Sequence, residues 1–267
     1  MFASEKKEVL LSVKNVSKSY GEGKEKKKVL NNISFDIHNI VRPGILQGQI
    51  ISLIGVSGCG KSTLFHILSG MEDEYEGEVL VNNKKISIGD MGVVFQDYYF
   101  FGWRKVKKIL ELAAKKNELL KDKAIRDKEI AAIVNELNLS EHLNKFSNQL
   151  SGGQRQRVAI AEQLLNGSNF LLLDEPFSGL DALMIDKVTN ILTRITSGDE
   201  LKTIIIVSHD ISNSVAISDT VLVMKPAPDG SIISKEIDLI SRDLAWRPGV
   251  KDLPEFRQVL KEIKGFM

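Results

Sequence analysis

GVSGCGKST, residues 55–63, is the stretch that decides the fold of this 267-residue chain. It has the spacing G-x-x-x-x-G-K-[ST], follows the apolar run Ile50–Ile54 and precedes the helix-like run Leu64–Gly70. Glycines let backbone N–H groups curve around phosphate oxygens, and the start of the following helix adds the positive end of its dipole. The order of strand, glycine loop and helix therefore predicts a phosphate-binding loop within an α/β protein.

Two side chains of this loop carry the expected chemistry. Lys61 should reach the β- and γ-phosphates of ATP, and the Ser62 hydroxyl should ligate Mg²⁺. Cys59 is interpreted as a small filler rather than a catalytic thiol, because phosphoryl chemistry already has its groups in the loop. The residues expected to bind Mg-ATP here are Gly55, Ser57, Gly58, Cys59, Gly60, Lys61, Ser62 and Thr63.

FLLLDE, residues 170–175, delivers two adjacent carboxylates at the end of an apolar run. Two neighbouring acids alone usually mark solvent or a turn, but after a phosphate loop they predict a second part of the same site. Asp174 is expected to hold Mg²⁺, directly or through water, and Glu175 is expected to polarise a water for in-line attack on the γ-phosphate.

LSGGQRQRVAIA, residues 150–161, resembles the signature of ATP-binding-cassette (ABC) ATPases, and the order of the other motifs agrees with that family. Ser151, Gly152 and Gly153 can form a second anion-binding turn at the start of a helix, with Gln154 behind them. The alternative for SGG before a helix is a plain capped turn.

The resemblance extends over residues 9–224 and implies roles for four further residues. Tyr20 matches the aromatic residue that stacks on adenine, and Gln96 matches the glutamine that senses Mg²⁺ and couples the sheet core to the helical subdomain. Asp181 matches the acid of a loop that crosses between two ATPase domains, and His209 matches the switch histidine that contacts the γ-phosphate. For each residue there is a simpler alternative without a role in ATP binding. In the same order, these are a tyrosine at a strand end, a polar residue at a strand end, a simple turn and a structural histidine.

In that family two ATPase domains pair head to tail, so each ATP is held between the phosphate loop of one subunit and the signature of the other. One cassette in the chain then implies a dimer, formed with a second copy or with a paralogous ATPase. The resemblance is to importer-type subunits, and more loosely to the nitrate, sulfonate and taurine branch. It implies an integral membrane permease and a solute-binding protein as partners, and it does not identify the transported substrate.

The competing interpretation is a soluble ABC ATPase that acts on DNA, ribosomes or protein assembly. Such relatives typically carry two cassettes, long coiled coils or zinc-binding cysteines, and these features are absent from this sequence. A kinase, a GTPase or a regulator that does not hydrolyse ATP fits less well, because the signature and Glu175 are present and an N-K-x-D motif is not.

The aromatic run YYFFGW, residues 98–103, has two interpretations. It lies just after Gln96, where importer subunits contact the coupling helix of their permease. Burial in the subunit's own core explains the same aromatic residues equally well.

The remaining pattern predicts an α/β fold with a parallel sheet core, an N-terminal antiparallel β subdomain and an inserted helical subdomain. Val9–Val16 and Val29–Ile37 predict the antiparallel strands, and residues 38–49 are interpreted as a loop. FLLLD and TIIIVSH predict buried parallel strands that end in functional groups. Residues 103–151 lack Gly and Pro and mix apolar with charged residues, which favours helices.

We expect a single ABC ATPase domain over residues 1–267, with a helical signature subdomain at about 97–155 and a C-terminal extension at 225–267. In that extension, Asp252 is expected to cap a helix that has Pro254 in its first turn. Its apolar face should pack onto the chain's own domain, and the alternative is that it binds a partner.

Composition excludes several classes of function. Lys plus Arg number 36 and Asp plus Glu number 35, so the global charge does not favour nucleic acid as a partner. The single cysteine excludes a disulfide framework, and neither a signal peptide nor a span of roughly 18 to 20 apolar residues is expected. We therefore expect a peripheral protein on the cytoplasmic face of the membrane, with the spanning part supplied by another chain.

Two features depart from the family pattern. The loop at residues 38–49 is longer than usual, and AEQLL replaces the more common ARAL after the signature. Glu162 and Gln163 leave the predicted site residues intact but put in doubt the contacts usually made there by an arginine.

Overall fold

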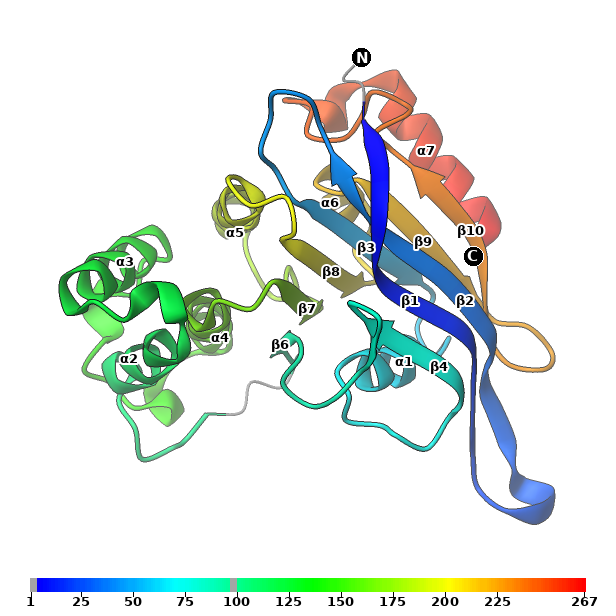
Figure 1. Ribbon diagram of the computed structural model, residues 1–267, viewed down its shortest axis with the longest axis horizontal. Coiled ribbons are helices and arrows are strands. Elements are labelled where there is room, and N and C mark those ends of the chain that lie inside the picture. Colours follow the sequence, from blue (N-terminus) through cyan, green and yellow to red (C-terminus); the bar gives the residue numbers. More distant parts are fainter. Residues whose placement is uncertain (1–3, 97–99) are drawn as a thin grey trace.

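The computed structural model describes residues 4–96 and 100–267 and contains two sheets of different kinds (Figure 1). One is a four-stranded antiparallel sheet with the order β2-β1-β4-β5, and the other is a six-stranded sheet with the order β10-β9-β3-β8-β7-β6. The strands are β1 (Glu5–Tyr20), β2 (Lys27–Val41), β3 (Gln49–Gly55), β4 (Glu76–Val81), β5 (Lys84–Lys85), β6 (Gly92–Val94), β7 (Phe170–Asp174), β8 (Thr203–Ser208), β9 (Thr220–Lys225) and β10 (Ile232–Asp238).

The α-helices follow strands along the chain, and most of them pack on the six-stranded sheet. They are α1 (Lys61–Leu68), α2 (Val106–Lys116), α3 (Lys123–Glu136), α4 (Gly152–Asn166), α5 (Ala182–Thr196), α6 (Ile211–Ala216) and α7 (Pro254–Phe266). In Figure 1, α2 and α3 lie at the opposite end of the molecule from the tip of the β1–β2 hairpin. The predicted fold class is confirmed: a mostly parallel sheet core, an antiparallel N-terminal sheet and an inserted group of helices.

The apolar strands of the six-stranded sheet are buried on both faces. β3 pairs in parallel with β8 and β9, and β7 pairs in parallel with β6 and β8. Successive side chains of a strand point to opposite faces, so Leu171 and Leu173 join the core under α4 and α5, whereas Leu172 joins the core around α1. Both faces are covered, which explains why FLLLD and TIIIVS are continuous apolar runs rather than alternating ones.

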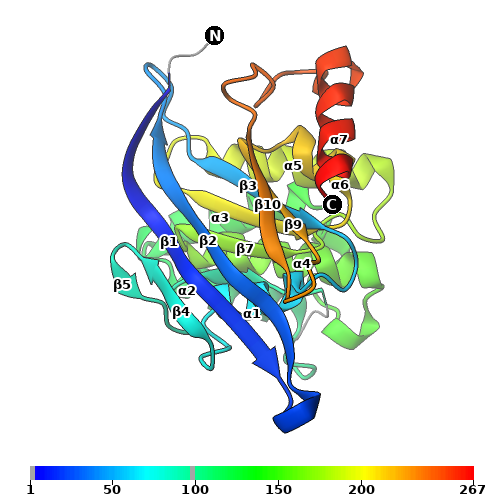
Figure 2. The ribbon, with the colours of Figure 1, turned by 90° about the vertical axis from the view of Figure 1, so that its right-hand side faces the viewer.

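The N-terminal hairpin is longer than the sequence indicates. β1 and β2 pair antiparallel from Glu5↔Val41 to Tyr20↔Lys27, and Figure 2 shows the two strands running the length of one side of the molecule. The prediction that the loop begins at His38 is wrong, because residues 38–41 continue β2 and His38 pairs with Val9. Pro43 and Gly44 mark a turn, but the β-branched residues before them extend the strand.

A buried ion pair anchors the end of this hairpin to the amino ends of β3 and β9 in the six-stranded sheet. The guanidinium of Arg42, whose side chain is 4% exposed, contacts the carboxylate of Asp219, which is fully buried. Arg42 also donates to the carbonyl oxygen of Gly48 at 3.0 Å. Asp219 accepts in addition from the backbone N–H of Ile50 at 2.8 Å and from Trp246 Nε1 at 2.6 Å. This cluster ties the segment after β2, the start of β3 and the C-terminal region to one carboxylate.

Replacing Arg42 with Met should lower the free energy of unfolding by about 3–5 kcal/mol, because it leaves the Asp219 carboxylate buried without its cation. Trp246→Phe is the matched milder variant, since it removes one hydrogen bond to a charged group, worth about 1.5–3 kcal/mol. Urea unfolding of the three proteins measures both effects. A loss below about 1 kcal/mol for Arg42→Met would show that the ion pair does not hold these segments together.

The C-terminal extension packs onto the chain's own domain, as predicted. Phe256, Val259 and Ile263 of α7 are buried in a core with β9 and β10, and Figure 2 shows α7 beside these strands. The expected cap is wrong: Leu253 occupies the N-cap position without a side-chain hydrogen bond, and Asp252 ends a short 3₁₀ helix instead. Pro254 at the first helical position sets the start of the helix.

The region between β6 and β7 is helical, as its composition predicts. α2 and α3 pack on each other and on α4 through apolar residues that include Leu110, Ile133 and Val158. None of the helices in the described part of the chain is long and apolar enough to cross a membrane.

Candidate active site at the carboxyl ends of the parallel strands

The predicted catalytic and metal-binding residues meet in one cavity. β3, β6, β7 and β8 run parallel, so their carboxyl ends lie at the same edge of the sheet. A cavity of about 450 Å³ opens there. Its lining comprises Val29, Ser57, Gly58, Gly60, Lys61, Ser62, Thr63, Gln96, Asp174, Glu175 and His209. Sequence reasoning missed Val29, which comes from the antiparallel hairpin.

The glycine loop fits tightly between β3, the hairpin and α1. Gly60 caps α1 with φ = 83°, and a Cβ there would lie 2.9 Å from Leu30 Cδ2, so only glycine fits without strain. Lys61, 9% exposed, folds over the loop and donates to the carbonyl oxygens of Gly55 at 2.8 Å and Val56 at 3.0 Å. The loop therefore holds its cation at the cavity wall.

Cys59 turns away from the cavity. Its side chain is 1% exposed and belongs to the core beneath the loop, with residues of β3 and α1. Burial raises the pKa of the thiol, while the nearby Lys61 lowers it by a smaller amount. This position agrees with the interpretation of Cys59 as a filler.

Glu175 is held in an unusual geometry where the chain leaves β7. Its φ is +51°, in the left-handed region that non-glycine residues rarely adopt. Its backbone N–H donates to the carbonyl oxygen of Val207 at 2.8 Å. One carboxylate oxygen accepts from the backbone N–H of His209 at 2.9 Å and lies 2.7 Å from Nδ1 of the same residue. The other accepts from the Ser208 hydroxyl at 2.8 Å.

The neighbouring carboxyl of Asp174 has a raised pKa. Its pKa rises from 3.8 to about 6, chiefly because the carboxyl is buried and also because Glu175 lies beside it, while Lys61 opposes both effects. The folded chain therefore binds this proton more tightly than the unfolded chain does. Folding stability consequently falls as pH rises from 3.8 toward about 6, where the carboxyl ionises.

Asp174→Asn should stabilise the nucleotide-free chain at about pH 7.5 by about 1 kcal/mol, a value reduced because solvent screens part of the carboxyl. The gain should shrink at about pH 5, where wild-type Asp174 is mostly protonated. Thermal unfolding of both proteins at the two pH values measures it. A difference of the same size at both pH values would contradict ionisation of Asp174 as its cause.

Several predicted site residues lie outside this cavity. Ser151 and Gln154 form a reciprocal cap at the start of α4: the Gln154 N–H donates to Ser151 Oγ at 3.3 Å, and Gln154 Oε1 accepts from the Ser151 N–H at 3.0 Å. Asp181 caps α5 by accepting from the Met184 N–H at 2.9 Å. The other predicted residues that do not line the cavity are Tyr20, Gly55, Cys59, Gly152 and Gly153.

Tyr20, at the end of β1, is 44% exposed. The Lys18 ammonium lies 4.9 Å from the centroid of its ring. The ring is therefore accessible beside the hairpin.

Sequence reasoning also missed Gln156, which connects α4 to residues 175–176 after β7. Its side chain is 1% exposed, and Nε2 donates to the carbonyl oxygens of Pro176 at 2.6 Å and Glu175 at 3.4 Å. The only signal in the sequence is a polar residue on the inner face of an amphipathic helix. That signal does not identify its partners.

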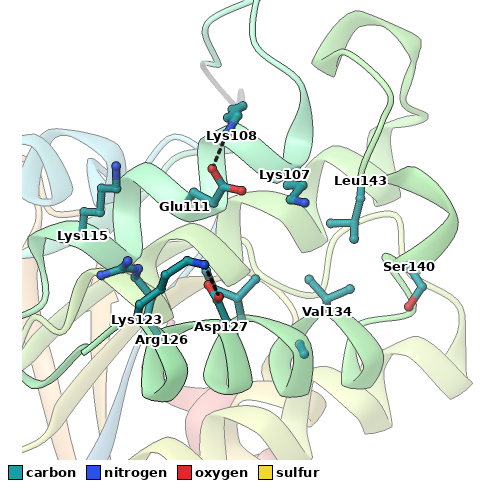
Figure 3. A pocket seen from close by; sticks show the side chains of 12 residues that line it. Lys107, Lys108, Glu111, Lys115, Lys123, Arg126, Asp127, Val134, Ser140 and Leu143 are labelled. Carbon is teal, nitrogen blue, oxygen red and sulfur yellow. Dashed lines mark hydrogen bonds and ion pairs between the residues drawn. The ribbon is translucent and has the colours of Figure 1, made fainter. Parts of the chain in front are cut away.

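A second cavity, of about 640 Å³, lies between α2 and α3 (Figure 3). Its rim is basic, but Lys108 pairs with Glu111 at 2.6 Å and Lys123 faces Asp127 at 3.8 Å. These carboxylates neutralise part of the rim. The cavity does not include the glycine loop or the strand ends, so the phosphate chemistry belongs to the first cavity.

The glycine loop, the paired carboxylates and the helix-capping signature define a phosphate-loop ATPase of the ATP-binding-cassette type. The family model described as "ABC transporter" matches residues 30–178. The aliphatic sulfonates import ATP-binding protein SsuB of Bacillus cereus is 32% identical over 255 residues, 95% of this chain and 94% of that protein. SsuB of Bacillus subtilis is 33% identical over 257 residues, 96% of this chain and 92% of that protein.

Solved structures agree with this relationship. The dimeric post-hydrolysis state of the ATP-binding cassette MJ0796, bound to ADP and Pi, superposes with a TM-score of 0.70 at 29% identity. The match covers 86% of this chain and 98% of that one. The chain belongs to the ABC transporter family.

This membership confirms the predicted activity: the chain is an ATP-binding and ATP-hydrolysing subunit that powers transport. The alternative of a soluble ABC ATPase acting on DNA, ribosomes or protein assembly is not supported. The resemblance to the importer type and to its sulfonate branch is also confirmed, because the relatives are named as sulfonate import proteins.

Proposed function

We propose that the cavity at the strand ends holds the triphosphate of ATP, with Lys61 on the β- and γ-phosphates and Glu175 as the general base for hydrolysis. The observation that carries this proposal is the convergence of Lys61, Asp174, Glu175 and His209 on one cavity. Glu175 polarises the attacking water, and the exposed His209 ring contacts the γ-phosphate. Tyr20, whose ring is accessible, stacks on adenine.

The donor set at this cavity fits Mg²⁺. Ser62, Gln96 and Asp174 offer hydroxyl, amide and carboxylate oxygens, which are the ligands that Mg²⁺ prefers. Mg²⁺ in such sites is usually held by one or two protein oxygens together with substrate phosphates. When bound, Mg²⁺ neutralises charge on the phosphate oxygens.

The signature completes the site from a second copy of the chain. Ser151, Gly152, Gly153 and Gln154 do not line the cavity of their own chain, so their helix start is available to the γ-phosphate held by a partner. Asp181 sits at the start of α5, in the loop that crosses between the two copies. A head-to-tail dimer with two composite sites follows.

Glu175→Gln should bind ATP, form a stable ATP-dependent dimer and lose turnover by about 10²–10⁴-fold, the usual contribution of a general base. Size-exclusion chromatography with and without Mg-ATP detects the dimer, and phosphate release gives the rate. Lys61→Ala is the matched control, because it should abolish both dimer formation and turnover through lost binding. Wild-type turnover in Glu175→Gln would refute the assignment of the base.

The aromatic segment after Gln96 contacts a membrane permease at the cytoplasmic face of the membrane. The described residues of this run divide between the two interpretations, because Phe100 packs against the core. Phe101 and Trp103 favour an interface: they are 51% and 73% exposed, and their ring centroids lie 5.3 Å apart. Tyr98 and Tyr99 lie outside the described residues. Trp103 also lines a cavity of about 550 Å³ with Leu112, Phe146 and several lysines, which suits an apolar segment that carries acidic residues.

Trp103→Ala should reduce the integral membrane protein that co-purifies with the tagged chain from solubilised membranes by about tenfold or more, because buried Trp residues dominate interface energies. ATP hydrolysis by the detached subunit should stay within about twofold of wild type. Leu119→Ala is the matched control, since Leu119 is 84% exposed and lies outside this cavity. An unchanged yield of the membrane protein would place the permease contact elsewhere.

The permease and a solute-binding protein choose the transported substrate, and this chain supplies the energy. The relatives named above are sulfonate importers, so uptake of a small organic anion is the first activity to test.

A further inference from the structure

Ser208 lies between the phosphate cavity and the core, as the last residue of β8, and is fully buried. Its hydroxyl makes two hydrogen bonds: Oγ donates to Glu175 Oε2 at 2.8 Å and accepts from the backbone N–H of Asp210 at 3.0 Å. The role proposed above for His209, the next residue, does not use this hydroxyl.

The direction of the bond between Ser208 and Glu175 is fixed by chemistry. A backbone N–H can only donate, so the N–H of Asp210 occupies a lone pair of Ser208 Oγ. A hydroxyl has one proton, and here it is directed to Glu175 Oε2. The backbone N–H of His209 donates to the other oxygen at 2.9 Å. Two donors of fixed polarity therefore hold the two carboxylate oxygens.

The two side chains around Glu175 differ in their freedom to move. The His209 side chain is 65% exposed, whereas Ser208 is completely buried by its neighbours. When the His209 ring turns toward the γ-phosphate, the Ser208 hydroxyl and the His209 N–H remain on the carboxylate. The Ser208 hydroxyl is therefore an anchor for Glu175 that does not depend on the position of the His209 ring.

We propose that Ser208 is a positioning residue for ATP hydrolysis: its hydroxyl fixes the Glu175 carboxylate so that Oε1 faces the attacking water. This inference rests on the proposed role of Glu175 as the general base. Ser208 itself does not touch the nucleotide cavity, whose lining includes Glu175 and His209 but not Ser208.

The test compares steady-state ATP hydrolysis by wild type, Ser208→Ala and Ser208→Thr. Ser208→Ala should lower kcat about ten- to a hundredfold and leave KM for ATP within about twofold, because the lost hydrogen bond orients the base and does not contact the nucleotide. Ser208→Thr keeps the hydroxyl and should restore kcat to within about threefold of wild type. Ser52→Ala is the matched control: Ser52 is equally buried, but its Oγ lies 2.6 Å from Ser218 Oγ. It should leave kcat within about twofold.

A double-mutant cycle separates positioning from general damage. In the Glu175→Gln background, where no carboxylate remains to be placed, adding Ser208→Ala should change the single-turnover rate by less than about twofold. The double variant should also form the ATP-dependent dimer, which shows that the fold and the nucleotide site are intact.

Three outcomes overturn the inference. They are a normal kcat in Ser208→Ala, an equal loss in the Glu175→Gln background, and a failure of Ser208→Thr to recover activity while its melting temperature is unchanged. The role of Glu175 is tested separately: if Glu175→Gln alone retains full turnover, the proposed base is wrong, whatever Ser208 does.

Discussion

The parallel register of three neighbouring strands is the constraint on which the site depends. β8 lies between β3 and β7, with Ser208 opposite Ile54 and Val207 opposite Asp174. This alignment places the phosphate loop, the paired carboxylates and the histidine at one edge, although they lie far apart in the sequence. A slip of one residue would reverse the faces of every side chain in a strand, and the core on both faces of the sheet forbids it. The pairing of these buried aliphatic residues thus fixes the positions of polar side chains that are not part of the apolar core.

Buried carboxylates have different surroundings at the two ends of the same sheet. At the carboxyl end, Asp174 and Glu175 lie side by side and repel, and burial keeps the pKa of Asp174 near 6. At the other end, Asp219 is satisfied by Arg42, Trp246 and a backbone N–H. Burial raises the pKa of Asp219 to about 6 as well, so both carboxylates cost folding free energy when they ionise. The proposed role of the first is to bind a cation, whereas the second holds three segments together.

The sequence predicts the motif residues well because each follows a short apolar strand, so that local pattern alone places Lys61 and Glu175 at the carboxyl ends of the strands. It does not predict partners that meet only through tertiary structure. Arg42 and Asp219 are 177 residues apart, and the bonds of Gln156 and Ser208 to the catalytic segment leave no periodic signal. The expected cap at Asp252 fails for a related reason: the chain makes a 3₁₀ turn there, and proline alone sets the start of the helix.

The two tryptophans of the chain occupy contrasting surroundings. Trp103 is 73% exposed on the aromatic segment, whereas Trp246 is partly buried and donates its indole N–H to Asp219. Their fluorescence should therefore separate by emission maximum and by quenching with soluble iodide. The native protein thus carries two optical probes, one on the surface proposed to contact the permease and one at the anchored edge of the sheet. Binding of the permease and loosening of the fold can then be followed in the same sample without an added label.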